Sequence, residues 1–400
     1  MPNLITLDDL DLGSLRGKRV FVRVDFNVPL SADHEVLDAT RIEEALPTIR
    51  ELTGAGARVL LASHAGRPKG ERDPRYSLRP VAVKLADLLD QGVRFAPDCV
   101  GPEVEKLAAE MDPGEVMLLE NLRFHAGETK NAPAFAGQLA ALAEVFVDDA
   151  FGSAHRAHAS VVGVAERLPE KAAGRLMARE VEALGKLLGE PERPFAALLG
   201  GAKIEGKIDT LENLLPRLDI LLLGGGMANT FLAAQGHDMA GSLFESDRLD
   251  MARDILERAR SRGAEVLLPV DVVVAETLDE PAWVRTVRAD QVPAGAKALD
   301  VGPETRKAFA KAIGRAKTLF WNGPLGVFEK PPFDEGTNEV ARALASFSGY
   351  SVIGGGETVA AANRAGVSEQ IGHVSTGGGA SLEFLAGKTL PGVEILERGR

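Results

Sequence analysis

The chain has 400 residues, of which 45% are hydrophobic and 26% charged, and its formal net charge at pH 7 is −12. This length predicts two domains, and the acidic balance argues against nucleic acid or a membrane surface as the main partner. The single cysteine, Cys99, excludes an internal disulfide and is expected to be a small buried residue rather than a reactive thiol. The first ten residues lack a signal-peptide pattern, and no apolar run is long enough to span a membrane. We therefore expect a cytoplasmic protein.

Strand and helix patterns alternate along the first half of the chain. The apolar periodicity predicts strands at 19–24, 57–63, 116–119 and 145–147, and helices at 40–52, 79–89, 100–110 and 132–142. This alternation predicts a doubly wound parallel sheet. Ligands of such sheets collect at the carboxyl ends of the strands.

Basic side chains fall within or just after these strands. Any one of them alone is most often a solvated surface charge, but the carboxyl ends of parallel strands share one edge of the sheet. Guanidinium groups suit carboxylate and phosphate ligands. We therefore expect these side chains to gather around one small anion. The residues concerned are Arg23, His64, Arg67, Arg123, His155, Arg156 and His158.

Residues 174–188 have apolar positions at helical spacing, and Gly189 and Pro191 end the pattern. This segment is predicted to be a stiff helix that connects two domains. The second half repeats the alternation, with strands expected near 195–199, 219–223, 265–268, 270–274, 298–301, 317–321, 350–353 and 372–375. The predicted fold is α/β, with two doubly wound domains, each a mostly parallel sheet flanked by helices.

The run at 195–199 leads into Gly200, Gly201 and two lysines, Lys203 and Lys207. The glycines allow the backbone to approach an anion, and lysines four residues apart are predicted to share one face of the following helix. The spacing resembles a P-loop, but Ile208 stands where a P-loop has Ser or Thr to hold magnesium. The prediction is a polyphosphate cradle, with a glycine turn and two solvated lysines as the alternative.

Three further glycine clusters follow predicted strands, at 224–226, 354–356 and 377–379. Each would place backbone N–H groups at a helix N-terminus, where phosphate oxygens bind, although glycine also permits close helix packing. None matches G-x-G-x-x-G, which disfavours a dinucleotide site. Trp321 is expected in the core, and Glu329 near a ribose hydroxyl. No catalytic base stands out, as is acceptable if the acceptor is a carboxylate that is already ionised at neutral pH.

Eight motifs occur in a fixed order along the chain. They are Arg23-Val-Asp-Phe-Asn-Val-Pro29, His64-Ala-Gly-Arg-Pro68, Glu120-Asn-Leu-Arg123, Asp149-Ala-Phe-Gly-Ser-Ala-His-Arg-Ala-His158, Gly200-Gly-Ala-Lys203 with Lys207, Trp321-Asn-Gly-Pro-Leu-Gly-Val-Phe-Glu329, Gly354-Gly-Gly356 and Thr376-Gly-Gly-Gly-Ala380. Through these motifs the whole chain resembles the phosphoglycerate kinase family. The resemblance implies reversible phosphoryl transfer between 1,3-bisphosphoglycerate and ADP, giving 3-phosphoglycerate and ATP in glycolysis. It also implies Mg²⁺ bound with the nucleotide, hinge closure of two domains, and a monomer whose partners are small-molecule substrates.

The resemblance also implies roles for individual residues. Those implied at the phosphoglycerate are Asp25, Asn27, Arg41, His64, Arg67, Arg123 and Arg156. Those implied at the transferring phosphoryl group are Arg41, Lys203, Gly355 and Gly378. Those implied at the nucleotide are Gly201, Lys203, Lys207, Gly302, Asn322, Glu329, Gly354, Gly355, Gly356, Glu357 and Thr358. Arg23, His155 and His158 are interpreted as supporting or domain-closure groups.

One position departs from the family pattern, because Glu357 stands where the family has the aspartate that contacts the metal-nucleotide. Glutamate keeps the charge and adds a methylene, so direct, water-mediated and lost metal contact all remain open. A non-catalytic nucleotide or phosphometabolite sensor and a P-loop hydrolase are the alternative functions. The expected domains are 1–173 for phosphoglycerate, 174–189 as the connecting helix and 190–385 for the nucleotide, while residues 386–400 are implied to return to the first domain.

Overall fold

The computed structural model describes residues 2–399, and the chain divides into two compact units. Unit 1 runs to Glu182 and includes the segment from Thr389, and unit 2 is Ala183–Lys388. The division falls inside helix α6 (Arg175–Leu188) rather than at one of its ends. Among the described residues, no helix is both long and apolar enough to cross a membrane.

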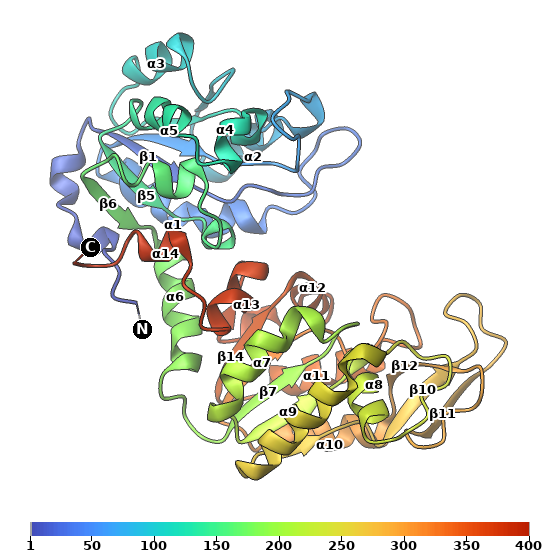
Figure 1. The fold of residues 1–400 in the computed structure, drawn as a ribbon. Coiled ribbons are helices and arrows are strands. Elements are labelled where there is room, and N and C mark those ends of the chain that lie inside the picture. Colours follow the sequence, from blue (N-terminus) through green and yellow to red (C-terminus); the bar gives the residue numbers. More distant parts are fainter. Residues whose placement is uncertain (1, 400) are drawn as a thin grey trace. The chain divides into compact units, whose positions relative to one another are not determined.

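Unit 1 is built on a six-stranded parallel sheet in the order β3-β4-β2-β1-β5-β6. Its strands are β1 (Arg19–Arg23), β2 (Arg58–Ala62), β3 (Val93–Phe95), β4 (Val116–Leu118), β5 (Val145–Asp148) and β6 (Glu170–Ala173). The helices around it are α1 (Thr40–Gly54), α2 (Arg79–Leu89), α3 (Pro102–Ala109), α4 (Ala126–Thr129) and α5 (Pro133–Ala140). Figure 1 shows the strands enclosed between these helices. The sequence missed β3 and β6, since these short edge strands are only partly apolar and partly buried.

The core of unit 1 explains why its central strands read as continuous apolar runs. Val20 and Val22 of β1 pack with Ile42 and Ile49 of α1 on one face of the sheet. The intervening Phe21 points to the other face, where its ring stacks on that of Phe146 at a centroid distance of 6.1 Å. Parallel strands covered on both faces need apolar residues at every position.

Unit 2 has a second six-stranded parallel sheet, in the order β15-β14-β13-β7-β8-β9. Its strands are β7 (Phe195–Leu199), β8 (Ile220–Leu223), β9 (Glu265–Leu267), β13 (Thr318–Asn322), β14 (Tyr350–Gly354) and β15 (His373–Val374). Its helices are α7 (Ile208–Leu214), α8 (Gly225–Ala234), α9 (Leu249–Ser261), α10 (Pro303–Ile313), α11 (Glu335–Ala345), α12 (Gly356–Arg364) and α13 (Gly379–Leu385). The predicted α/β class with two parallel sheets is confirmed. Trp321 is fully buried in the core of this unit, as expected.

A separate three-stranded antiparallel sheet was not anticipated. It has the order β11-β10-β12 and consists of β10 (Asp271–Ala275), β11 (Val284–Arg288) and β12 (Lys297–Val301). The sequence located β10 and β12 but gave no sign that they form an antiparallel sheet of their own. It missed β11 because this edge strand is mostly exposed, so its composition carries no buried apolar face.

The C-terminal segment packs within unit 1. Helix α14 (Pro391–Glu394) lies close to the loop after β5, where the N–H of Gly392 donates to the carbonyl of Ala154 at 2.8 Å. The N–H of Ile5 donates to the carbonyl of Leu396 at 2.8 Å, and Leu396 is fully buried. Residues from both ends of the sequence therefore belong to one core.

Cys99 is fully buried, as expected from the sequence. Burial, together with the nearby carboxylates of Asp98 and Glu128, raises the pKa of its thiol well above the ordinary value. The thiol is therefore protonated at neutral pH, and thiols react as thiolates.

A buried acid in β5 predicts how the stability of unit 1 depends on pH. Asp148 is fully buried, its Oδ1 accepts the N–H of Ala150 at 3.0 Å, and its Oδ2 has no hydrogen-bond partner. Burial raises its pKa to about 7, from about 3.9 in an unfolded chain. Since the folded state holds the proton more tightly, this group stabilises the fold at low pH, and the contribution is lost as the pH rises through 7.

We therefore expect Asp148→Asn to lose less unfolding free energy than the wild type when the pH rises from about 5 to about 8, because Asn cannot ionise. Urea unfolding at both pH values measures this difference. Asp33→Asn, at an exposed carboxylate, is the matched control and should follow the wild type. Equal pH slopes for the wild type and Asp148→Asn would contradict the assignment.

Candidate active site

The carboxyl ends of four neighbouring strands carry the predicted anion ligands of unit 1. Strands β4, β2, β1 and β5 are adjacent in the sheet. The segments that follow them are 25–27 after β1, 64–67 after β2, 121–123 after β4 and 153–158 after β5. The strand order thus brings residues that are far apart in the sequence to one edge.

Arg23 ends β1, and its guanidinium group is fully buried. Its Nε donates to Ser160 Oγ at 2.9 Å, and its Nη2 donates to Ser153 Oγ at 3.2 Å. Nη1 donates to the carbonyl of Val24, and Nη2 lies 3.1 Å from His64 Nδ1. This side chain joins three loops and faces the protein rather than solvent.

His64 is a neutral group within this basic edge. It is 5% exposed, and its pKa is held well below the ordinary value by burial first and then by the positive charges of Arg23 and Arg123. Because Nδ1 accepts from Arg23, the proton of the neutral ring is on Nε2. His64 therefore offers a donor without adding charge.

Four further predicted residues, Asp25, Asn27, Arg41 and Arg123, are held by hydrogen bonds at this edge. Arg41 Nη1 donates to Asp25 Oδ2 at 2.7 Å. Asn27 Oδ1 accepts the N–H of Gly66 at 2.9 Å, and Arg123 Nη1 donates to the carbonyl of Gly66 at 2.7 Å. Burial lowers the pKa of Arg123 to about 10, so it remains charged at neutral pH.

A pocket of about 440 Å³ opens beside these residues. Its lining includes predicted residues Arg67, Arg123, Arg156 and His158, and it contains no acidic side chain among the residues that the structure describes. The sequence reasoning missed three further lining groups, Lys69, His125 and Lys130, which are visible in the sequence only as charges in loops. Asp25, Asn27, Arg41 and His64 lie at the same sheet edge but do not line this pocket. Such a concentration of cationic groups suits a small anion.

The lysines of unit 2 are arranged differently from the prediction. Lys203 is exposed in an irregular segment, Lys207 ends a 3₁₀ turn (Glu205–Lys207), and α7 begins only at Ile208. The predicted shared helix face is therefore wrong. Gly206 disfavours helix within the turn, and the N–H of Ile204 is held by Glu245 Oε2 at 2.6 Å.

Lys207 is turned toward the glycine pair. Its Nζ donates to the carbonyl of Gly200 at 2.7 Å. Burial lowers its pKa, while the negative charge of Glu357 opposes that shift. Lys207 and Glu357 are therefore electrostatic neighbours, although Lys207 ends the 3₁₀ turn and Glu357 lies in the first turn of α12.

The sequence left two roles open for the glycine clusters, phosphate binding at a helix N-terminus and close packing of the backbone. Gly224, Gly355 and Gly378 are the N-cap residues of α8, α12 and α13. A Cβ at Gly200 would lie 2.2 Å from the carbonyl oxygen of Pro324, so this glycine serves close backbone packing. At Gly356 and Gly378 a Cβ would meet nothing within 4 Å, which leaves the space that a ligand needs.

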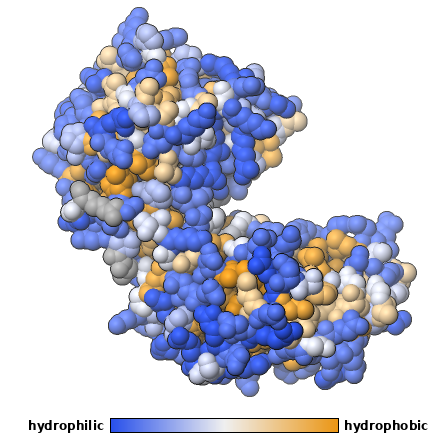
Figure 2. Space-filling view, viewed as in Figure 1, coloured by the Kyte–Doolittle hydropathy of each residue, from blue (hydrophilic) through white to orange (hydrophobic). Residues whose placement is uncertain are grey.

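A second pocket, of about 600 Å³, lies entirely in unit 2. Its walls come from the start of α8, the loop 241–244, strands β10 and β12, and the segment 324–329. Apolar lining is supplied by Leu243, Val272, Leu299 and Val327, and charged lining by Lys297, Asp300, Glu329 and Glu357. Figure 2 shows hydrophobic residues at the surface over α8 and β12. An apolar wall with a few polar groups is the usual make-up of a small-molecule site.

Three predicted nucleotide residues line this pocket, namely Gly201, Glu329 and Glu357. The others do not, and they are Lys203, Lys207, Gly302, Asn322, Gly354, Gly355, Gly356 and Thr358. Two of these side chains connect neighbouring backbone segments. Asn322 Nδ2 donates to the carbonyl of Gly354 at 2.7 Å, and Thr358 Oγ1 accepts the N–H of Gly323 at 2.6 Å. Gly302 makes room for Asp271, whose carboxylate would lie 2.3 Å from a Cβ. The antiparallel strands supply the apolar wall that the sequence reasoning missed.

Comparison with known proteins gives one consistent result. The family described as phosphoglycerate kinase matches residues 7–388. A phosphoglycerate kinase from Thermus thermophilus is 56% identical over 394 residues, covering 98% of this chain and 99% of that protein. One from Moorella thermoacetica is 55% identical over 392 residues, covering 98% of each. The solved structure of phosphoglycerate kinase from Coxiella burnetii superposes with a TM-score of 0.89 at 42% identity, and that from Pyrococcus horikoshii with 0.84 at 32%, each covering 98% of both chains.

The packing at Gly200 gives a stability prediction. Gly200→Ala would force a Cβ against the carbonyl oxygens of Gly323 and Pro324, so we expect a loss of about 1–3 kcal/mol in the free energy of unfolding. Gly206→Ala, six residues away with open space at its Cβ, is the matched control and should stay within about 0.5 kcal/mol of the wild type. Urea unfolding followed by circular dichroism measures both. Equal stability of the two variants would refute the packing role of Gly200.

Proposed function

Because this chain belongs to the phosphoglycerate kinase family and is a phosphotransferase, we propose that it transfers a phosphoryl group reversibly between 1,3-bisphosphoglycerate and ADP, giving 3-phosphoglycerate and ATP in glycolysis. The observation that carries this proposal is the anion pocket of unit 1, which has Arg67, Arg123 and Arg156 in its lining and no acidic side chain among the described residues. A metabolite with a phosphate and a carboxylate needs such a site. The acidic protein of net charge −12 otherwise repels anions.

Unit 1 is proposed to bind the phosphoglycerate. The three arginines of the pocket bind its anionic groups, since a guanidinium group can donate two parallel hydrogen bonds to phosphate or carboxylate. Asp25, Asn27, Arg41 and His64 are proposed to complete the site at the same sheet edge. His64 donates from Nε2, and Asp25 holds Arg41 through their 2.7 Å contact. Arg23, His155 and His158 are proposed to support this site or to assist domain closure.

Unit 2 is proposed to bind the nucleotide as its magnesium complex. The apolar wall of the larger pocket suits a nucleobase, and Glu329 suits the ribose. Gly201, Lys207 and the backbone around 354–358 are proposed to face the phosphates, while Gly302 and Asn322 frame the site. Glu357 is exposed and lines the pocket, so its carboxylate fits the oxygen ligation that Mg²⁺ prefers.

The transfer step needs neutralisation of charge rather than a base. The acceptor carboxylate is ionised at neutral pH, and the transferring phosphoryl group carries negative charge toward the nucleotide. Arg41 and Lys203 supply positive charge, and the backbone amides of Gly355 and Gly378 supply donors. Because the two substrates are assigned to different units, we propose that the units close on each other during turnover and that the chain acts as a monomer in the cytoplasm.

The direct test of this function measures ATP consumption with Mg²⁺ and 3-phosphoglycerate as the sole acceptor. We expect turnover that needs both the acceptor and Mg²⁺. No turnover above background would exclude the kinase and favour the sensor alternative. Glu357, which replaces the family's aspartate, is the residue that points to that alternative. ATP hydrolysis without 3-phosphoglycerate would indicate a hydrolase instead.

The transition-state assignment is tested by Arg41→Ala and Lys203→Ala. We expect each to lower kcat by about 10²- to 10³-fold with a smaller change in KM, because both groups act chiefly on the charge of the moving phosphoryl group. Lys106→Ala, at an exposed lysine of α3, is the control and should retain wild-type kcat. Changes confined to KM in the first two variants would contradict the assignment.

A further inference from the structure

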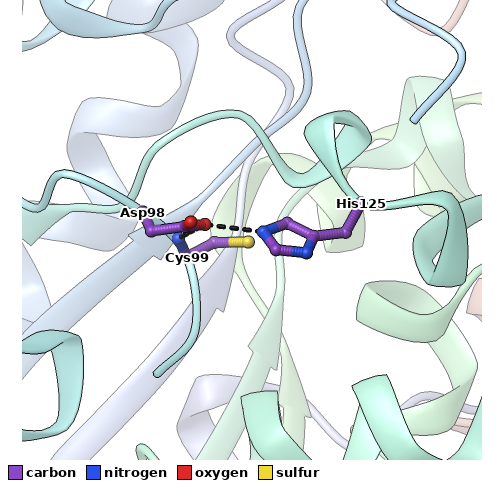
Figure 3. A group of neighbouring side chains, drawn as sticks. All are labelled: Asp98, Cys99 and His125. Atoms are coloured by element: carbon purple, nitrogen blue, oxygen red, sulfur yellow. Dashed lines mark hydrogen bonds and ion pairs between the residues drawn. The ribbon is translucent and has the colours of Figure 1, made fainter. Parts of the chain in front are cut away.

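Three potential metal ligands meet in unit 1 outside the residues given roles in phosphoryl transfer. Asp98 and Cys99 lie in the loop after β3, and His125 follows the 3₁₀ turn Leu122–Phe124 after β4. One ligand atom from each residue lies within 4.8 Å of the other two. Figure 3 shows the carboxylate and the thiol both directed at the imidazole ring.

The geometry of this cluster is fixed by its surroundings. His125 Nε2 lies 2.6 Å from Asp98 Oδ1, and the ring stacks on Phe135 at a centroid distance of 5.1 Å. The N–H of Cys99 also donates to Asp98 Oδ1, at 2.7 Å. The stacking on Phe135 orients the imidazole, and the backbone N–H of Cys99 orients the carboxylate. The contact between His125 Nε2 and Asp98 Oδ1 joins two of the ligand groups to each other, so a bound ion would replace it.

The cluster is also reachable from outside. Cys99 is fully buried, but the side chains of Asp98 and His125 are 37% and 32% exposed. His125 is at the same time part of the lining of the anion pocket. Two of the three ligand side chains can therefore meet an ion from solvent.

From these observations we propose that Asp98, Cys99 and His125 form a binding site for a sulfur-preferring divalent cation of the Zn²⁺ class. The three ligand atoms are a carboxylate oxygen, the cysteine sulfur and an imidazole nitrogen, with water as the fourth ligand. On binding, the metal–sulfur bond replaces the S–H bond, and the proton passes to solvent. Zn²⁺ binds each of these donor types in proteins, and three protein ligands with water as the fourth is the arrangement of zinc sites with an open position.

The chemistry of the ligands separates this site from the magnesium of the nucleotide. Mg²⁺ binds oxygen ligands in an octahedral arrangement and has little affinity for thiolate. Only one side chain of the cluster offers oxygen. The site therefore discriminates in favour of Zn²⁺ or Co²⁺, and it is chemically distinct from the magnesium of the nucleotide, although His125 also lines the anion pocket.

Cobalt gives a specific test, because thiolate-bound Co²⁺ absorbs in the near ultraviolet and Cys99 is the only cysteine of the chain. The full-length protein, treated with a chelator and a reductant, is titrated with Co²⁺. We expect a thiolate-to-cobalt band that saturates at one equivalent, disappears on adding Zn²⁺ and persists in excess Mg²⁺.

Variants assign the ligands. Cys99→Ser should abolish the band, and His125→Asn and Asp98→Asn should each weaken Co²⁺ binding at least tenfold. His34→Asn, at an exposed histidine, is the matched control and should bind as the wild type does. Thermal unfolding checks that each variant is folded. If Cys99→Ser does not fold, the test rests on the variants of His125 and Asp98, which are partly exposed.

The proposal is overturned if no band forms in the wild type. It is also overturned if His125→Asn and Asp98→Asn both bind Co²⁺ as tightly as the wild type, since Cys99 would then act alone. Displacement of Co²⁺ by Mg²⁺ would contradict the assigned class of cation. None of these outcomes depends on phosphoglycerate kinase activity, so the proposal stands or falls separately from the proposed function.

Discussion

A buried guanidinium group is the constraint on which the anion site depends. Arg23 places a full positive charge in the interior of unit 1, and such a charge is tolerated only when its donors are satisfied. Ser160 links it to a second buried charge, because its hydroxyl accepts from Arg23 and donates to Glu128 Oε1 at 2.7 Å. Removing one member of such a network leaves the other charge uncompensated, at a cost of about 3–5 kcal/mol. The hydrogen bonds that satisfy the buried charge of Arg23 thus fix the loops after β1, β2 and β5.

The buried network around Arg23 also fixes the positions of groups at the anion site. His64 Nδ1 is held by Arg23, so the ring presents its Nε2 donor in one orientation. Glu128 also accepts the N–H of Ser160 at 3.0 Å and lies 3.6 Å from His158 Nδ1. The loop that carries Arg156 and His158 is therefore anchored on both sides. Cationic groups that repel one another can gather in one pocket because the backbone beneath them is tied down.

Sequence patterns predicted those parts of the fold whose signal is local. Strands such as β1 and β7 are buried on both faces, so their composition alone identifies them. The direction of β10 and β12 depends on pairing with distant partners, which periodicity does not report. The placement of Lys203 and Lys207 failed for a related reason, since Glu245, 38 residues beyond Lys207 in the sequence, holds the loop away from helix.

The candidate site shows the same division. Strand ends predicted which residues of unit 1 meet, because sheet geometry brings them to one edge. The apolar wall of the larger pocket in unit 2 was not predictable, since Val272 and Leu299 read as ordinary core positions until the antiparallel sheet is known. Likewise, helix α3 and strand β4 separate the pair Asp98 and Cys99 from His125 in the sequence, and only the tertiary fold brings the three together.

The C-terminal segment has a consequence for how the protein is made. Residues from Thr389 onward complete the core of unit 1, yet a ribosome translates them after the whole of unit 2. Without the residues after Lys388, unit 1 lacks part of its core, because Leu396 is fully buried within it. The part of the chain that is synthesised first thus needs the last residues to complete its core.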